Sequence, residues 1–194
     1  MIRSFAAILI FGAALAVAQH SHSAFAQSID GPPQSAAVED MAVFEPYIGR
    51  FRSEDKTSDE GPSFFYEIDY RWYDRGHTIV SYALILVVPS QDRRVGIGDG
   101  YYYVDRINGR IGVFGVFPDG RPGLGALGEF DRVTGARTVW VTGVGPNGVR
   151  TQVRDHFEII DGNTWRNATH IRQGDDDWRQ IGSDIYTRLS DNES

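Results

Sequence analysis

The chain has no cysteine among its 194 residues. This absence excludes a lipoprotein anchored through an amino-terminal cysteine, a disulfide scaffold, thiol catalysis and zinc sites built on cysteine. Lysine is almost as rare, because Lys56 is the sole example. With 19 basic against 26 acidic residues and a formal net charge of -7, and with no basic cluster, the chain is not expected to bind nucleic acid or anionic lipid.

The sequence also lacks an apolar run long enough to span a bilayer well. A short apolar run, residues 6–18, follows Arg3 and precedes the small-x-small site Ala24-Phe25-Ala26. This pattern is typical of a secretory signal peptide over residues 1–26, with an uncleaved anchor as the alternative. We therefore expect a periplasmic or secreted protein with no membrane span in its mature form. Export without disulfides fits a bacterial periplasm at least as well as a eukaryotic secretory route.

The alternation of apolar and charged side chains is clearest in residues 64–73. Every second side chain from Phe64 to Trp72 is aromatic or aliphatic, whereas most of those between them are charged, such as Glu67 and Asp69. Successive side chains of a strand point to opposite sides, so this segment is predicted to be a strand with one buried face. Burying each ring contributes about 2 kcal/mol, which places the aromatic face inside.

No convincing helix follows residue 47. Turn residues separate ten apolar segments: 48–51, 64–73, 78–88, 95–105, 110–117, 123–131, 137–144, 149–160, 164–172 and 178–189. Such spacing predicts an all-β fold, an antiparallel up-and-down β-barrel of about 8–10 strands, with a sandwich as the alternative. A barrel is favoured because closure removes free sheet edges. Asn108-Gly109 is predicted to form a two-residue hairpin turn.

The predicted organisation is a single domain. Residues 1–26 are the signal peptide, 27–43 a flexible leader, 44–189 the barrel and 190–194 a polar tail. A short helical turn is predicted within residues 38–47, where apolar residues have roughly helical spacing.

Two polar residues fall on otherwise apolar inner faces. In residues 151–159 and 164–172 the inner sets include Asp155 and Asn167. A buried carboxylate needs a donor. Asn167 could be that donor, or both residues could face a ligand; the alternative is that Asp155 lies near a strand end or bulge that water reaches.

These assignments define a candidate binding site in the lumen for a small apolar or aromatic ligand. Asp155 and Asn167 are its polar residues. The remaining candidates are Tyr66, Tyr70, Trp72, Tyr82, Trp140 and Trp165.

No cofactor or metal is expected. His156 and His170 fall on the outer faces of adjacent strands, where nothing supplies a third ligand, and His77 is in a turn. Because His156 and His170 point outward, a haem site inside the barrel is also disfavoured. The chain has no Ser-His-Asp spacing, P-loop or dinucleotide motif, and the glycine-rich residues 96–100 precede a strand instead of a phosphate-binding helix.

Two short motifs carry a resemblance to a known family. Tyr47-Ile48-Gly49-Arg50-Phe51 resembles the Gly-x-Trp motif of the calycin superfamily, with Phe51 in the Trp position. Tyr186-Thr187-Arg188 resembles the terminal arginine that packs over that ring and closes the barrel. The chain is thus similar, over residues 44–189, to lipocalin and fatty-acid-binding-protein-like barrels, and more narrowly to small exported bacterial lipocalin-like domains.

Three functions follow as hypotheses. The first is a binding protein with a ligand in the lumen. The second is a filled barrel with a structural or interaction role, because bulky rings can fill a small lumen. The third, implied by isomerases and cyclases among related barrels, is an enzyme for an apolar substrate with Asp155 as acid or base. The sequence indicates no oligomeric state.

Overall fold

The computed structural model describes residues 38–58, 61–116, 121–144 and 149–190. The predicted signal peptide, residues 27–37 of the leader and residues 191–194 of the tail lie outside this part of the chain. None of the helices in the described part is both long and apolar enough to cross a membrane.

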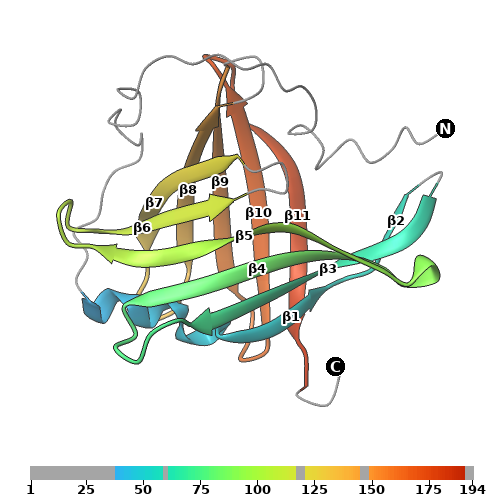
Figure 1. The fold of residues 1–194 in the computed structure, drawn as a ribbon, viewed down its shortest axis with the longest axis horizontal. Helices are drawn as coiled ribbons and strands as arrows, with labels where there is room; N and C mark the ends of the chain where they lie inside the picture. The colour runs from blue at the N-terminus through green and yellow to red at the C-terminus, as the bar shows by residue number, and fades with distance from the viewer. Residues whose placement is uncertain (1–37, 59–60, 117–120, 145–148, 191–194) are drawn as a thin grey trace.

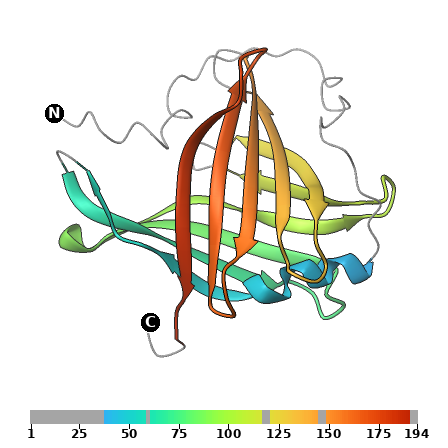
Figure 2. The ribbon, with the colours of Figure 1, turned by 180° about the vertical axis from the view of Figure 1, so that it is seen from behind.

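The fold is a closed barrel of ten antiparallel strands to which one short strand is added. Each strand pairs with the next along the chain, and β1 closes the ring by pairing with both β11 and β3, whereas β2 pairs with β3 alone. Two short 3-10 helices complete it, η3 (Val38–Tyr47) and η4 (Pro89–Gln91). Figures 1 and 2 show η3 lying across the lower end of the barrel. The strands are β1 (Gly49–Ser53), β2 (Lys56–Ser58), β3 (Gly61–Trp72), β4 (Ile79–Val88), β5 (Arg93–Asp105), β6 (Arg110–Val116), β7 (Pro122–Phe130), β8 (Arg137–Val144), β9 (Arg150–Ile159), β10 (Thr164–Gln173) and β11 (Arg179–Arg188).

The barrel prediction is confirmed, and the ten predicted segments correspond to the ten strands of the ring. One turn differs. Asp105 pairs with Arg110, so the loop has four residues, 106–109, and the predicted two-residue turn is wrong. The Asp105 carboxylate accepts hydrogen bonds from Asn108 N at 3.2 Å and Nδ2 at 2.7 Å. Only Gly109 has a positive φ, of 60°, whereas a two-residue I′ turn needs two such residues.

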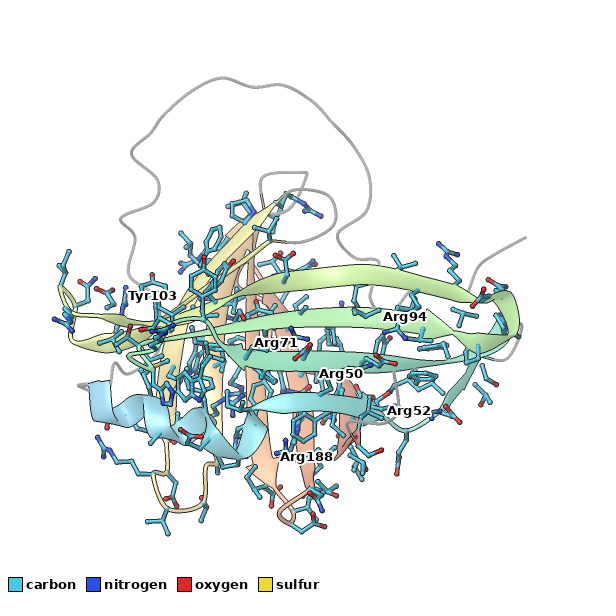
Figure 3. The ribbon with its side chains drawn as sticks, turned by 60° about the horizontal axis from the view of Figure 1, so that its bottom comes forward. Arg50, Arg52, Arg71, Arg94, Tyr103 and Arg188 are labelled. Carbon is cyan, nitrogen blue, oxygen red and sulfur yellow. The ribbon has the colours of Figure 1, made fainter. Side chains whose placement is uncertain are left out.

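The alternation of β3 is oriented as predicted. Tyr66, Ile68 and Tyr70 face inward and are 6%, 8% and 1% exposed. On the outer face Glu67 is also buried, at 8%. Figure 3 shows arginine side chains along the outer side of these strands, and they account for this burial.

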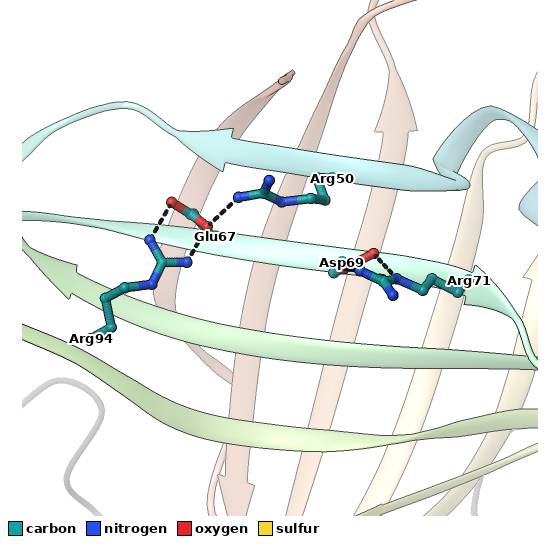
Figure 4. A network of polar contacts seen from close by, with 5 residues as sticks. All are labelled: Arg50, Glu67, Asp69, Arg71 and Arg94. Atoms are coloured by element: carbon teal, nitrogen blue, oxygen red, sulfur yellow. Dashed lines mark hydrogen bonds and ion pairs between the residues drawn. The ribbon is translucent and has the colours of Figure 1, made fainter. Parts of the chain in front are cut away.

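Glu67 is the centre of an ion-pair network that crosses the closure of the barrel (Figure 4). Arg50 on β1 donates to its Oε2 at 3.3 Å, and Arg94 on β5 donates to its Oε1 at 3.1 Å and Oε2 at 2.6 Å. Burial alone would raise the pKa of Glu67, but the hydrogen bonds and charges of Arg94 and Arg50 outweigh it and lower that pKa. The network therefore connects β1 to β3 and β5 from outside.

Helix η3 closes the lower end of the barrel with apolar side chains. Phe44 and Tyr47 are 0% exposed, and Met41 and Val43 are 1% exposed. Met41 and Val43 fall in the predicted leader, residues 27–43, but their side chains belong to the core. Tyr47 also donates a hydrogen bond to the Gly135 carbonyl at 3.0 Å, which fixes η3 to the loop before β8.

Arg137 at the start of β8 is buried beneath η3, with 1% exposure. Its guanidinium carbon lies 3.6–6.0 Å from the centroids of five rings, which we call the aromatic cage: Phe44, Tyr47, Tyr70, Tyr102 and Phe157. No guanidinium nitrogen has a hydrogen-bond partner in the described part of the chain. Attraction between the cation and the ring faces is therefore the main compensation for burying this charge.

Arg188 at the end of β11 provides a second closing contact. Its guanidinium carbon lies 4.4 Å above the centroid of Phe51, which is the contact that the calycin resemblance implies. It also donates hydrogen bonds to the carbonyls of Pro46, at 2.9 Å, and Ile48. Gly49 permits this approach, because a Cβ there would lie 2.5 Å from Arg188 Nη1. Its φ of 126° is also one that residues with side chains rarely adopt.

We expect Arg137→Met to lower the free energy of unfolding by about 2 kcal/mol, since methionine fills the site but loses the cation–π attraction. Urea unfolding measures the difference. Arg166→Met is the control, because Arg166 is exposed and its hydrogen bond to Glu158 is on the surface; it should change stability by less than about 0.5 kcal/mol. A methionine variant at position 137 as stable as the wild type would contradict the role of the charge.

We expect Gly49→Ala to destabilise the barrel by about 1–3 kcal/mol, because it combines an unfavourable φ with displacement of Arg188. Thermal and urea unfolding measure this loss. Gly162→Ala is the matched control: its φ is not positive, and a Cβ there meets nothing within 4 Å. Equal stabilities of the two variants would rule out a special requirement at Gly49.

Candidate functional site

The lumen brings together six of the eight residues proposed from the sequence. Ladder pairing places Tyr70 opposite Tyr82, and Asp155 opposite both Val139 and Thr169, all on the inner face. Tyr66, Trp165 and Asn167 also point inward. These residues differ in what surrounds them, and that difference divides the lumen into a filled part and an open part.

Trp165 and Tyr70 belong to the filled part beside η3. Trp165 stacks on Tyr186, with centroids 4.2 Å apart and planes at 12°, and makes edge contacts with Tyr47 at 5.5 Å and Phe51 at 5.6 Å. Both Trp165 and Tyr70 are 1% exposed. Burial raises the pKa of Tyr70 well above its usual value. These two residues therefore contact other rings and leave no surface for a guest.

Trp72 lies at the end of the aromatic ladder. It pairs with Val80 and stacks on the His77 ring, with centroids 4.4 Å apart and planes at 4°. His77 Nδ1 in turn lies 3.8 Å from Glu45 Oε1 of η3. Trp72 thus contributes to the junction of β3 with η3, at the closed end of the barrel.

Trp140 lies outside the barrel, so the expectation that it lines the lumen is corrected. Val139, its neighbour, faces the core at 2% exposure, and alternation turns Trp140 to the other side. There it pairs with Arg154 and contacts Trp178 at 5.5 Å. Aromatic character suggested an inner position, but both faces of β8 carry apolar residues, and only the pairing with β9 decides the direction.

A polar cluster lies on the inner wall formed by β9 and β10. Thr169 Oγ1 donates to Asp155 Oδ1 at 2.6 Å and lies 3.0 Å from Asn167 Oδ1. Thr169, not Asn167, is therefore the main donor to the carboxylate. Asp155 is in the middle of β9, and the nearest bulge is in β11, where Ile181 is the extra residue opposite Thr169 and His170.

Burial raises the pKa of Asp155. Thr169, Asn167, His170 and Arg137 each favour the charged form and oppose this shift in part. Asp155 as a whole residue is half-buried. A carboxyl with a raised pKa keeps its proton to a higher pH than usual, and in that form it can both donate and accept hydrogen bonds.

A second polar pair lies close to this cluster. Asp184 is opposite Asn167 in the ladder, and its Oδ1 forms an ion pair with Lys56 Nζ. The ammonium group also lies 5.7 Å from the Tyr66 ring centroid. The single lysine of the chain thus comes from β2, a strand that falls between the predicted segments 48–51 and 64–73. Asp184 could have been found from its spacing to Tyr186 on the same face.

The open part of the lumen is away from η3. Glycines on two walls face it: Gly98 of β5, opposite Leu84, and Gly182 of β11, opposite Thr169. A Cβ added at either one meets nothing within 4 Å. Inward apolar side chains in this region keep partial exposure, namely Leu84, Leu86, Val141 and Val153.

Tyr82 lies against the wall of the barrel at Gly100 and Gly115. A Cβ at those glycines would come within 2.8 and 2.5 Å of the Tyr82 hydroxyl. Burial raises the pKa of Tyr82. The two glycines let this large ring lie close to the backbone, where it contacts Tyr102 at 5.4 Å and Tyr70 at 6.2 Å between ring centroids.

No cluster of three or more histidine, cysteine or acidic side chains with metal-binding geometry occurs in the described part of the chain. His156 Nδ1 instead lies 3.2 Å from Thr138 Oγ1 on the outer face.

Comparisons with known proteins support the fold. No family model matches the chain, and no curated protein matches it. Among solved structures, the crystal structure of Rv2717c from M. tuberculosis is similar, with a TM-score of 0.51 and 13% sequence identity. The similarity covers 78% of this chain and 98% of that chain. At this identity the likeness shows a shared barrel fold alone.

We expect Asp155→Asn to be more stable than the wild type at pH 7 and equally stable near pH 3, below the unfolded pKa of about 3.9. A group whose pKa is raised by folding contributes stability below its unfolded pKa, and that contribution is lost as the pH rises through the folded pKa. Asparagine resembles the protonated form at every pH. Urea unfolding at both pH values tests this, with the exposed Asp176→Asn as control; a difference independent of pH would contradict the raised pKa.

Proposed function

We propose that this protein binds a small, uncharged or cationic molecule with an apolar or aromatic body in the open part of the lumen. The observation that carries the proposal is the open space in front of Gly98 and Gly182 on two walls of the barrel. Ligand pockets are commonly apolar cavities with a few convergent polar groups. Leu84, Leu86 and Val141 supply the apolar wall.

The charge of the ligand follows from the polar residues in the lumen. Asp155 and Asp184 both face it, and Lys56 neutralises only Asp184. Arg137 is enclosed by the aromatic cage and does not reach the open part. An anionic ligand would therefore be repelled, whereas a hydroxyl or amine can donate to Asp155 or Asn167.

Membership of a superfamily and the location of the protein also belong to this proposal. The Arg188–Phe51 contact supports membership of the calycin superfamily. The predicted signal peptide supports action in the periplasm or outside the cell. The alternative of a filled barrel describes the half beside η3, where Trp165 and Tyr70 are enclosed by rings, but the open space beside Gly98 favours a ligand.

Catalysis is a second candidate, favoured by the raised pKa of Asp155. A carboxyl whose pKa is raised by burial can act as a general acid, as an isomerase or cyclase requires. The two candidates differ in the expected effect of Asp155→Asn: loss of turnover with binding retained for an enzyme, and a modest change in affinity alone for a binding protein.

We expect Gly98→Phe to weaken binding of the uncharged fluorescent probe N-phenyl-1-naphthylamine by about tenfold or more, since the ring would occupy the open space. Gly96→Phe is the matched control, because Gly96 is on the same strand, faces outward opposite Ile85, and also has nothing within 4 Å of a built Cβ. Probe fluorescence and energy transfer from tryptophan measure the affinity. Equal affinities of the two variants, or no binding to the wild type, would overturn the proposal.

A further inference from the structure

A groove of about 500 Å³ lies on the outer surface of strands β7–β10. Ladder pairing places Trp140, Arg154 and His170 in one row across it, and Thr138, His156 and Ala168 in the next. The small side chain of Ala168 between larger neighbours makes the surface concave. The lining residues are Glu129, Thr138, Trp140, Arg154, His156, Ala168 and His170.

Arg154 is held in this groove by aromatic rings. Its guanidinium carbon lies 5.6 Å from the Trp140 ring centroid and 5.0 Å from that of Trp178. It makes no ion pair with a carboxylate of the described residues. Arg166 on the same outer face differs, because it is paired with Glu158 at 2.5 Å. The positive charge of Arg154 is therefore both positioned and available.

The histidines add hydrogen-bonding groups beside this charge. His170 Nδ1 is buried and has no hydrogen-bond partner among the described residues. His156 lies next to Thr138, at 3.2 Å between Nδ1 and Oγ1. Glu129 is the single acidic residue of the lining. The groove thus combines a fixed cation, an indole and two imidazole rings, one of which has a buried nitrogen without a hydrogen-bond partner among the described residues.

We propose that this groove is a second binding site, for a small organic anion whose carboxylate or phosphate pairs with Arg154 and whose flat body packs on Trp140. Guanidinium groups recognise such anions by paired, charge-assisted hydrogen bonds. Indole faces bind the planar surfaces of aromatic rings and the CH faces of sugars. The β8–β10 wall separates this site from the lumen, so the proposal does not depend on a ligand inside the barrel.

The indole resonances test the proposal directly. The chain has four tryptophans, so a ¹H–¹⁵N spectrum shows four indole signals, which single Trp→Phe variants assign. Titration with benzoate, phenyl phosphate or glucuronate should shift the signals of Trp140 and Trp178 and leave those of Trp72 and Trp165 unchanged. Benzyl alcohol, which lacks the charge, should bind with an affinity at least about tenfold lower, measured from the same signals. Comparing benzoate with glucuronate distinguishes an aromatic from a saccharide body.

Two substitutions locate the site. Arg154→Gln should weaken anion binding by about tenfold or more, whereas the control Arg166→Gln should leave it unchanged. Ala168→Phe should abolish binding by filling the groove. Gly98→Phe, which blocks the lumen, should have no effect here, so this proposal and the lumen proposal can fail separately. No shift at Trp140 in the wild type, or an unchanged affinity of Arg154→Gln, would overturn it.

Discussion

The enclosure of Arg137 by five aromatic rings is the constraint on which the closed end of the barrel depends. An arginine that is 1% exposed and has no hydrogen-bond partner among the described residues would be costly in an aliphatic core. The ring faces offset that cost because each presents negative electrostatic potential to the cation. Phe44 and Tyr47 come from η3, and Phe157 and Tyr70 from the barrel, so the cation binds the helix to the wall. It also fills the floor, which confines any ligand to the other half.

The strands and their faces could be predicted from the sequence because alternation with period two is a local property. Tyr66 and Tyr70 follow it on β3, and so do Asp155 and Asn167 on later strands. Trp140 could not be placed by composition, since its strand is apolar on both sides. The pairing of Val139 with Asp155 settles its direction, and register between distant strands is not a property of a single segment.

Other parts of the candidate site depend on contacts far apart in the sequence. Thr169 donates to Asp155 from the neighbouring strand, and Lys56 reaches Asp184 from a short strand that lies within a polar, turn-rich segment. The clustering of five rings around Arg137 is likewise a result of η3 folding onto the barrel. In each case the sequence shows the residue type but not its partner, because burial and charge pairing are decided by tertiary structure.

Strand β9 shows how one wall of a barrel can carry two opposite chemistries. Asp155 faces the lumen, whereas the adjacent Arg154 and His156 face the outer groove. At Asp155 and Arg154, alternation therefore places opposite charges on the two faces of a single layer of backbone. The two faces still influence each other, because His170 on the outer side favours the ionised form of Asp155. The two proposed sites consequently share a wall but select ligands of different charge, and each contributes to the electrostatic environment of the other.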